Sequence, residues 1–277
     1  MKKLRYQKIY RLMKQIPGKK HFKILGITLW RLHAYFVIYS IIGFFIETIF
    51  GIIRYGVLES RQSFLYGPFC AIYGLGAVIM IVSLQFFKKN YTSIFIGGCI
   101  VGSITEYLVS WIGEMLLHVK WWDYSEFPLN INGRICILYA IFWGFLGLYL
   151  MISLNPKIDK LIDFIKKKIP SNLLQIFVTS TIIFMFLDCV ITGMALNYFN
   201  IRVIKENAIE VKHQDYIDTQ YDKIYNNKFK VKIINKFLNN EKMLTIFPRL
   251  TVQDKSGKII YIKDLYPEIR TYYLKIN

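Results

Sequence analysis

The sequence predicts an all-α polytopic membrane protein: a five-helix transmembrane bundle followed by a small mixed C-terminal tail. Three observations predict this class: long apolar runs fill the middle of the chain, 54% of all residues are hydrophobic, and Lys and Arg gather beside the runs. A hydrocarbon core about 30 Å thick needs roughly 20 apolar residues in a helix. Five runs reach that length, at 32–53, 64–87, 91–117, 135–155 and 172–201.

The chain therefore divides into a basic segment 1–31, a transmembrane domain 32–201 and a polar tail 202–277. The first segment carries ten Lys or Arg and no acid, and Ile9, Leu12, Met13 and Ile16 share one face of an expected interfacial helix. Because basic loops stay inside, we expect a cell-membrane protein with a cytoplasmic N-terminus. Five spans would then place the tail outside, although it holds 15 basic residues and 9 acids.

The tail is expected to be partly helical and then to form a β-hairpin. Residues 250–252 and 259–262 are rich in β-branched and other apolar side chains, and the segment Asp254-Lys255-Ser256-Gly257 between them has turn composition.

The net charge of +18 does not indicate nucleic-acid binding, because the Lys and Arg residues lie next to apolar runs, where anionic membrane lipids attract them. No cofactor, metal site or enzymatic activity is expected. The four cysteines form no CxxC pair, Glu114 with His118 supplies only two ligands, and no ATP-binding GxxxxGK[ST] motif occurs.

Carboxylates within the apolar runs are the strongest site candidates, since a charge in lipid is costly unless it faces the bundle or a partner. They are Glu47, Glu106, Glu114 and Asp188. Helical rise places Glu47, Glu106 and Asp188 at one level, about 21–24 Å from the cytoplasmic face. The expected basic partners are Arg54, Arg61 and Arg134.

Arg134 opens the fourth run, where a cation opposes the helix dipole, so we expect it to pair with Glu106 or Glu47. Three interpretations remain open for this acid–arginine layer: structural ion pairing, a binding or proton-relay site that opens outward, or a membrane-edge position with no partner.

Two further segments are candidate interaction elements. Trp121 and Trp122, followed by Asp123, predict a membrane-interface anchor or a stacking site for an outer ligand. Gly98 and Gly102 form a GxxxG motif that predicts a close helix crossing.

Residues 157–169 predict a separate amphipathic helix, with Ile158, Leu161, Ile162 and Ile165 on one face. It would lie on lipid or dock a cytoplasmic partner, and Leu161, Asp163 and Ile165 are the residues expected to dock.

Five pieces of the chain within 35–155 together carry a family resemblance: GFFIE at 43–47, FLYGPFCAIYG at 64–74, TEY at 105–107, WWDYS at 121–125 and LNINGRIC at 129–136. In order and spacing they resemble the "putative ABC-transporter type IV" family, CmpB-like multi-pass membrane proteins found largely in Gram-positive bacteria. Ala71 stands where such proteins often have Pro. The resemblance implies a transporter permease, which would need an ATPase subunit in trans.

Three functions follow as hypotheses. The first is a permease-type transport subunit with the acid–arginine layer near the outer face. The second is a non-transporting membrane scaffold or envelope-assembly protein. The third is an intramembrane enzyme on lipid or envelope precursors, with Glu106 or Asp188 as acid or base.

Overall fold

The computed structural model describes residues 23–88, 90–117 and 122–275, and the expected amphipathic helix around Ile9–Ile16 lies outside them. The chain forms two compact units. Of the described residues, the first unit comprises those at 23–40 and 71–184, and the second comprises those at 41–70 and 185–275. Two helices, α2 and α7, contribute one part to each unit.

Among the described residues, four helices are long and apolar enough to cross a membrane. They are α2 (Leu29–Tyr55), α4 (Tyr91–Leu117), the continuous helix Ile137–Lys168, and α7 (Ser171–Glu206). They include the predicted first, third, fourth and fifth spans apart from residues at the ends, so the mostly helical membrane fold is supported. A short antiparallel pair, β1 (Lys23–Ile24) with β2 (Ile27–Thr28), precedes α2.

The predicted second span, 64–87, is not helical over its whole length. Residues 59–70 form a loop, and only α3 (Ala71–Ser83) and the 3-10 turn η1 (Leu84–Phe87) are helical. Gly67 has a φ of +80°, a left-handed conformation that favours glycine. Pro68 disfavours the right-handed helical conformation in the residue before it and has no N–H to donate. The helix therefore begins after this pair, although the apolar run begins before it.

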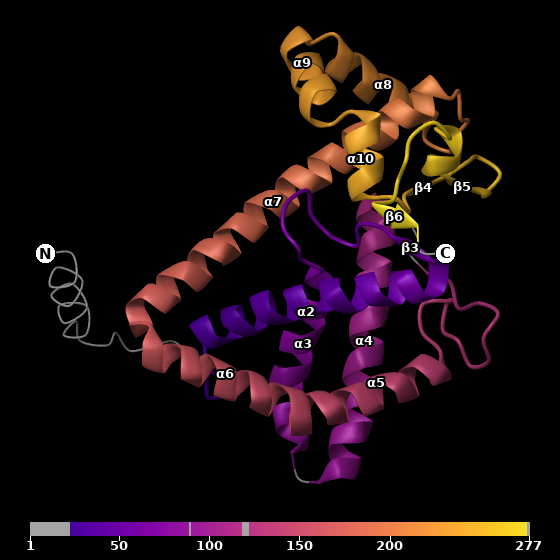
Figure 1. Ribbon diagram of the computed structural model, residues 1–277. Coiled ribbons are helices and arrows are strands. Elements are labelled where there is room, and N and C mark those ends of the chain that lie inside the picture. The colour runs from indigo at the N-terminus through magenta and orange to yellow at the C-terminus, as the bar shows by residue number, and fades with distance from the viewer. Residues whose placement is uncertain (1–22, 89, 118–121, 276–277) are drawn as a thin grey trace, which may run out of the picture. The chain divides into compact units, whose positions relative to one another are not determined.

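The α4–α5 contact confirms the close crossing predicted from Gly98 and Gly102. A Cβ on Gly98 would lie 2.9 Å from the Trp143 carbonyl oxygen and 3.1 Å from the Gly144 Cα, and one on Gly102 would overlap the Trp143 side chain. The absence of side chains at these two positions lets α5 (Ile137–Tyr149) approach the α4 backbone. On another side of α4, α3 lies alongside it (Figure 1).

The helix expected at 157–169 is not separate from the fourth span. A π-helical turn, η2 (Leu150–Leu154), joins α5 directly to α6 (Asn155–Lys168). Pro156 lies in the first turn of α6, where it removes one backbone donor and crowds the carbonyl four residues earlier. The wider π turn before it accommodates this crowding, so the chain remains one helix over 32 residues.

The second unit contains a packed domain built on the end of α7. Phe199, Ile201 and Val203 are no more than 1% exposed and pack with Met243 and Leu244 in one hydrophobic core. The helices of this domain are α8 (Gln214–Tyr225), α9 (Lys228–Phe237), α10 (Asn240–Ile246) and the 3-10 turn η3 (Ile262–Leu265).

The predicted hairpin is confirmed. Strand β4 (Thr251–Gln253) pairs antiparallel with β5 (Ile259–Tyr261), with Val252 opposite Ile260. A second antiparallel pair joins β3 (Val57–Leu58), just after α2, to β6 (Leu274–Lys275) near the end of the chain. The C-terminal segment is therefore part of a folded domain.

Candidate functional site

Glu106 is the centre of a polar cluster on α4. Its two carboxylate oxygens accept hydrogen bonds from different elements: Oε1 from the Tyr124 hydroxyl at 2.9 Å, and Oε2 from Trp143 Nε1 at 2.9 Å. Glu106 is only 9% exposed. The carboxylate thus fastens a loop residue and an α5 residue to the middle of α4.

The loop that carries Tyr124 is closed by its own hydrogen bonds. The Tyr124 amide donates to the Gly133 carbonyl at 2.8 Å, and Trp122 Nε1 donates to the Arg134 carbonyl at 3.0 Å. Asn132 and Gly133 both have positive φ, which reverses the chain there. Trp122 is therefore half-buried and holds the base of the loop, whereas Trp121 lies outside the described residues.

Tyr124 is set by packing as well as by Glu106. Its ring stacks on Tyr139 of α5 with centroids 4.5 Å apart. Burial and the neighbouring Glu106 carboxylate raise the pKa of Tyr124, so its hydroxyl stays a donor. Asp123, next to it, accepts hydrogen bonds from the backbone and side chain of Ser125 and shapes the turn.

The pairing predicted for Arg134 is wrong. Arg134 forms an ion pair with Glu114 at 2.6 Å and donates to Ser110 Oγ at 3.1 Å, while Glu106 binds the two aromatic donors. Glu106, Ser110 and Glu114 follow one another at four-residue spacing on one side of α4. The loop places Arg134 beside Ser110 and Glu114, the last two residues of this row.

Asp188 belongs to the second unit and binds backbone. Its Oδ2 accepts from the Tyr66 amide at 3.0 Å, and Thr192 Oγ1, one turn later on α7, accepts from the Leu65 amide at 2.9 Å. Asp188 is 2% exposed. Loop 59–70 has no helical hydrogen bonds, and these two side chains supply acceptors for two of its backbone amides.

Arg61 has a partner that the sequence did not indicate. Glu59, 6% exposed, pairs with Arg61 at 2.7 Å and with Arg249 of the C-terminal domain at 2.5 Å. Glu47 is half-buried on the part of α2 that belongs to this unit. Glu106 lies in the other unit, so the common level of Glu47, Glu106 and Asp188 stays a prediction.

A polar ladder between α2 and α6 was missed by the sequence reasoning. Arg31 Nε donates to Asp159 Oδ1 at 3.0 Å, the Tyr35 hydroxyl donates to the same oxygen, and the Tyr39 hydroxyl donates to Asn155 Oδ1 at 3.2 Å. The signal was available as two rows with four-residue spacing: Arg31, Tyr35 and Tyr39 facing Asn155, Asp159 and Asp163.

This ladder changes the interpretation of the predicted docking residues. Asp163 lies 3.4 Å from Arg31, so its carboxylate has an internal partner. Ile165 is half-buried, and Ile158 and Ile162 are buried. Leu161 remains 46% exposed, beside Phe164 at 54%. Leu161 and Phe164 are therefore the large apolar side chains that α6 leaves exposed.

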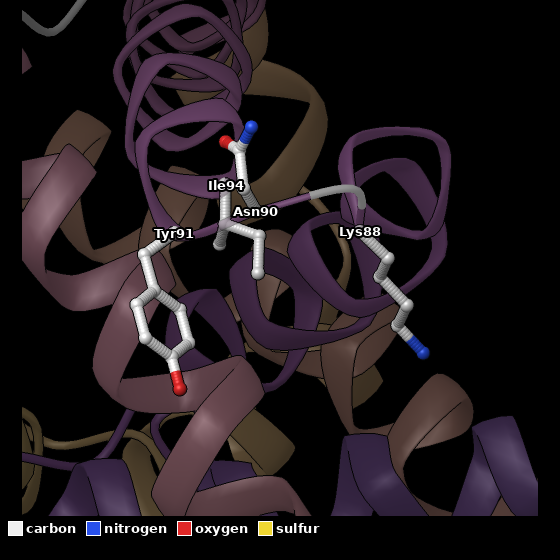
Figure 2. A pocket seen from close by; sticks show the side chains of 4 residues that line it. All are labelled: Lys88, Asn90, Tyr91 and Ile94. Atoms are coloured by element: carbon white, nitrogen blue, oxygen red, sulfur yellow. The ribbon is translucent and has the colours of Figure 1, made fainter.

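A hollow of about 270 Å³ lies at the connection between η1 and α4. It is lined by Lys88, Asn90, Tyr91 and Ile94. Figure 2 shows the Lys88 and Tyr91 side chains extending to one side with Ile94 between them, and the Asn90 amide pointing the other way. Asn90 caps the start of α4 by accepting from the Ser93 amide at 2.7 Å. This hollow contains no acid and is not the candidate site.

No group of three or more His, Cys, Asp and Glu side chains is placed to hold a metal ion within residues 23–88, 90–117 and 122–275. Hydrogen bonds and an ion pair connect Glu106 and Arg134 to their neighbours in the first unit, and hydrogen bonds connect Asp188 to loop 59–70 in the second.

Apolar helices of this length, with internally satisfied acids, indicate a membrane protein. Comparison with protein families gives a narrower assignment: residues 34–193 match the family described as "Putative ABC-transporter type IV". The match covers more than half of the chain, which therefore belongs to this family. The comparisons with curated proteins and with solved structures found no match.

Proposed function

We propose that this chain is the permease-type membrane subunit of a transporter driven by a separate ATPase. The observation that carries the proposal is the extent of the family match, 34–193, which includes Glu106, Arg134, Asp188 and most of each long helix. The sequence contains no P-loop motif, so ATP hydrolysis would come from a partner in trans.

The continuity of α5 and α6 supports this proposal. A movement of α6 would be transmitted along one helix into α5, whose Trp143 is bonded to Glu106 on α4 at 2.9 Å. The ladder from Asp159 to Arg31 and Tyr35 would carry the same movement into α2. In this proposal Leu161 and Phe164 receive the ATPase, and the Glu114–Arg134 pair belongs to a polar layer near the outer face.

The topology that we propose keeps five crossings, with the N-terminus in the cytoplasm of a bacterial cell and the C-terminal domain outside. The helical segment Ala71–Phe87 is about 28 Å long by standard rises, close to a hydrocarbon thickness of about 30 Å. It is connected to α4 through Lys88 and Asn90 and runs beside that helix. A reporter active only in the cytoplasm, fused after Asn277, should be inactive, and activity there would contradict five crossings.

Co-purification tests the transport proposal. The tagged full-length chain should recover an ATPase whose hydrolysis rate rises in its presence. Replacing Leu161 and Phe164 together by Ser should abolish both recovery and stimulation. Phe145 of α5, 63% exposed, gives a matched control, because Phe145→Ser removes an exposed apolar side chain from the same long helix outside α6. Equal recovery with all variants, or no ATPase with any, contradicts the proposal.

A scaffold or envelope-assembly role is the second candidate, and the C-terminal domain favours it. That domain has its own hydrophobic core and lies beyond residue 193, where the family match ends. A scaffold would recover envelope proteins without an ATPase, and removal of residues 207–277 would abolish that recovery. Under the transport proposal, the same truncation leaves the ATPase bound through α6.

A further inference from the structure

Helix α9 of the C-terminal domain presents an apolar stripe to the solvent. Phe229 is 72% exposed, Ile233 39% and Phe237 46%. They follow one another at four-residue spacing and cover an arc about 80° wide. Ile234, 4% exposed, fixes another face of α9 in the domain core. The helix is thus held on its domain while a second apolar face has no partner in the described chain.

The charges of α9 surround this stripe. Lys230 lies on one flank, Lys232 and Lys236 lie on the other, and Lys228 starts the helix. All four are exposed, and the helix contains no acid. Lys236 Nζ lies 5.2 Å from the Phe237 ring centroid, so this side chain lies along the stripe with its ammonium at the edge.

We infer that α9 binds an anionic lipid surface, with Phe229, Ile233 and Phe237 inserted at the boundary of headgroups and acyl chains and the lysines at the phosphates. A basic amphipathic helix with aromatic residues on its apolar face is the form that binds such surfaces. The domain is continuous with α7, a candidate membrane span, so a bilayer is always within reach.

Charge argues against the two other occupants. A second copy of α9 would bring lysines against lysines, because the helix has four and no acid. A protein groove would accept the stripe but would need an acidic rim on both flanks. An anionic bilayer provides an apolar interior for the stripe and negative charge on both of its flanks, and it attracts each basic residue near its surface. The inference does not depend on transport, since α9 lies outside residues 34–193.

A fluorescent probe on the full-length protein tests the inference. The four native cysteines are replaced, Ile233→Cys is labelled with an environment-sensitive fluorophore, and the protein is placed in nanodiscs with phosphatidylglycerol or with phosphatidylcholine alone. Asn235→Cys is the matched control, because Asn235 is exposed and lies about 160° away on the helix. We expect lipid-borne nitroxide to quench the probe at 233 in anionic nanodiscs, and iodide in water to quench the probe at 235.

The outcomes separate the occupants. Quenching by iodide at both positions means that α9 stays in water and overturns the inference. Protection of position 233 from both iodide and nitroxide means that protein covers the stripe, a second copy or a partner, and also overturns it.

Hydrogen–deuterium exchange on the chain with native cysteines keeps the test valid if the labelled variants do not fold. The α9 amides should exchange more slowly in anionic than in zwitterionic nanodiscs. Each basic residue contributes about a fivefold factor near such a surface, so Lys230, Lys232 and Lys236 replaced together by Gln should weaken binding about a hundredfold. Equal exchange in both lipids for the native chain overturns the inference.

Discussion

Glu106 and Asp188 are two acids in apolar helices that bind different kinds of group. Glu106 accepts from two side chains, a phenol and an indole, and so joins a loop and α5 to α4. Asp188 accepts from a main-chain amide of loop 59–70, with Thr192 beside it. One sequence signal, an acid in an apolar run, thus corresponds to side-chain packing in one unit and to support of irregular backbone in the other.

The largest expected effect is at Glu106. Glu106→Leu should lower the free energy of unfolding in detergent by about 2–5 kcal/mol, because it leaves two buried donors, the Tyr124 hydroxyl and Trp143 Nε1, without acceptors. Chemical denaturation measures the change. Glu106→Gln keeps one acceptor and should lose less. A Leu variant as stable as the native chain would show that this carboxylate does not hold the cluster together.

Substitution of Asp188 should lower the free energy of unfolding less than substitution of Glu106, and the amide variant should restore more of it. Asp188→Leu removes one amide acceptor and should cost about 1–3 kcal/mol, measured in the same way. Asp188→Asn retains a carbonyl oxygen for the Tyr66 amide and should recover most of the stability. If Asn is as damaging as Leu, the negative charge matters more than the backbone hydrogen bond, and the contrast with Glu106 disappears.

The ion pair of Arg134 with Glu114 should contribute less than either acid. Its side chains are 14% and 45% exposed, so a double-mutant cycle with Arg134→Gln and Glu114→Gln should give a coupling of about 0.5–1 kcal/mol. A parallel cycle of Arg134 with Glu106 should give almost none. Strong coupling in the second cycle would restore the pairing expected from the sequence.

The smallest effect concerns pH. Burial and the Glu106 carboxylate raise the pKa of Tyr124 in the folded protein. Its contribution to stability is therefore complete below the ordinary Tyr pKa of about 10 and is lost as pH rises through the higher folded pKa. Tyr124→Phe should be less stable at neutral pH but should lose stability less steeply above about pH 10. Parallel alkaline slopes in a pH series of denaturation curves would contradict this assignment.

The apolar runs were readable from the sequence because hydrophobic length is a local property. The bounds of α4, Tyr91–Leu117, are those expected from its run, and the β4–β5 hairpin follows local turn composition. Hydropathy placed the start of the second span too early, because it does not register that Gly67 and Pro68 delay the start of the helix. The apolar residues before Ala71 therefore belong to a loop.

The sequence by itself determined the membrane class, the family and which acids required an explanation, since composition and motif order depend on the chain alone. Only the tertiary structure decided their partners. Arg134 reaches Glu114 because loop 122–136 closes on itself, and Asp163 reaches Arg31 because α6 continues α5 through a π turn. Four-residue spacing shows which residues share a helix face, but which opposite charges meet depends on where distant elements pack.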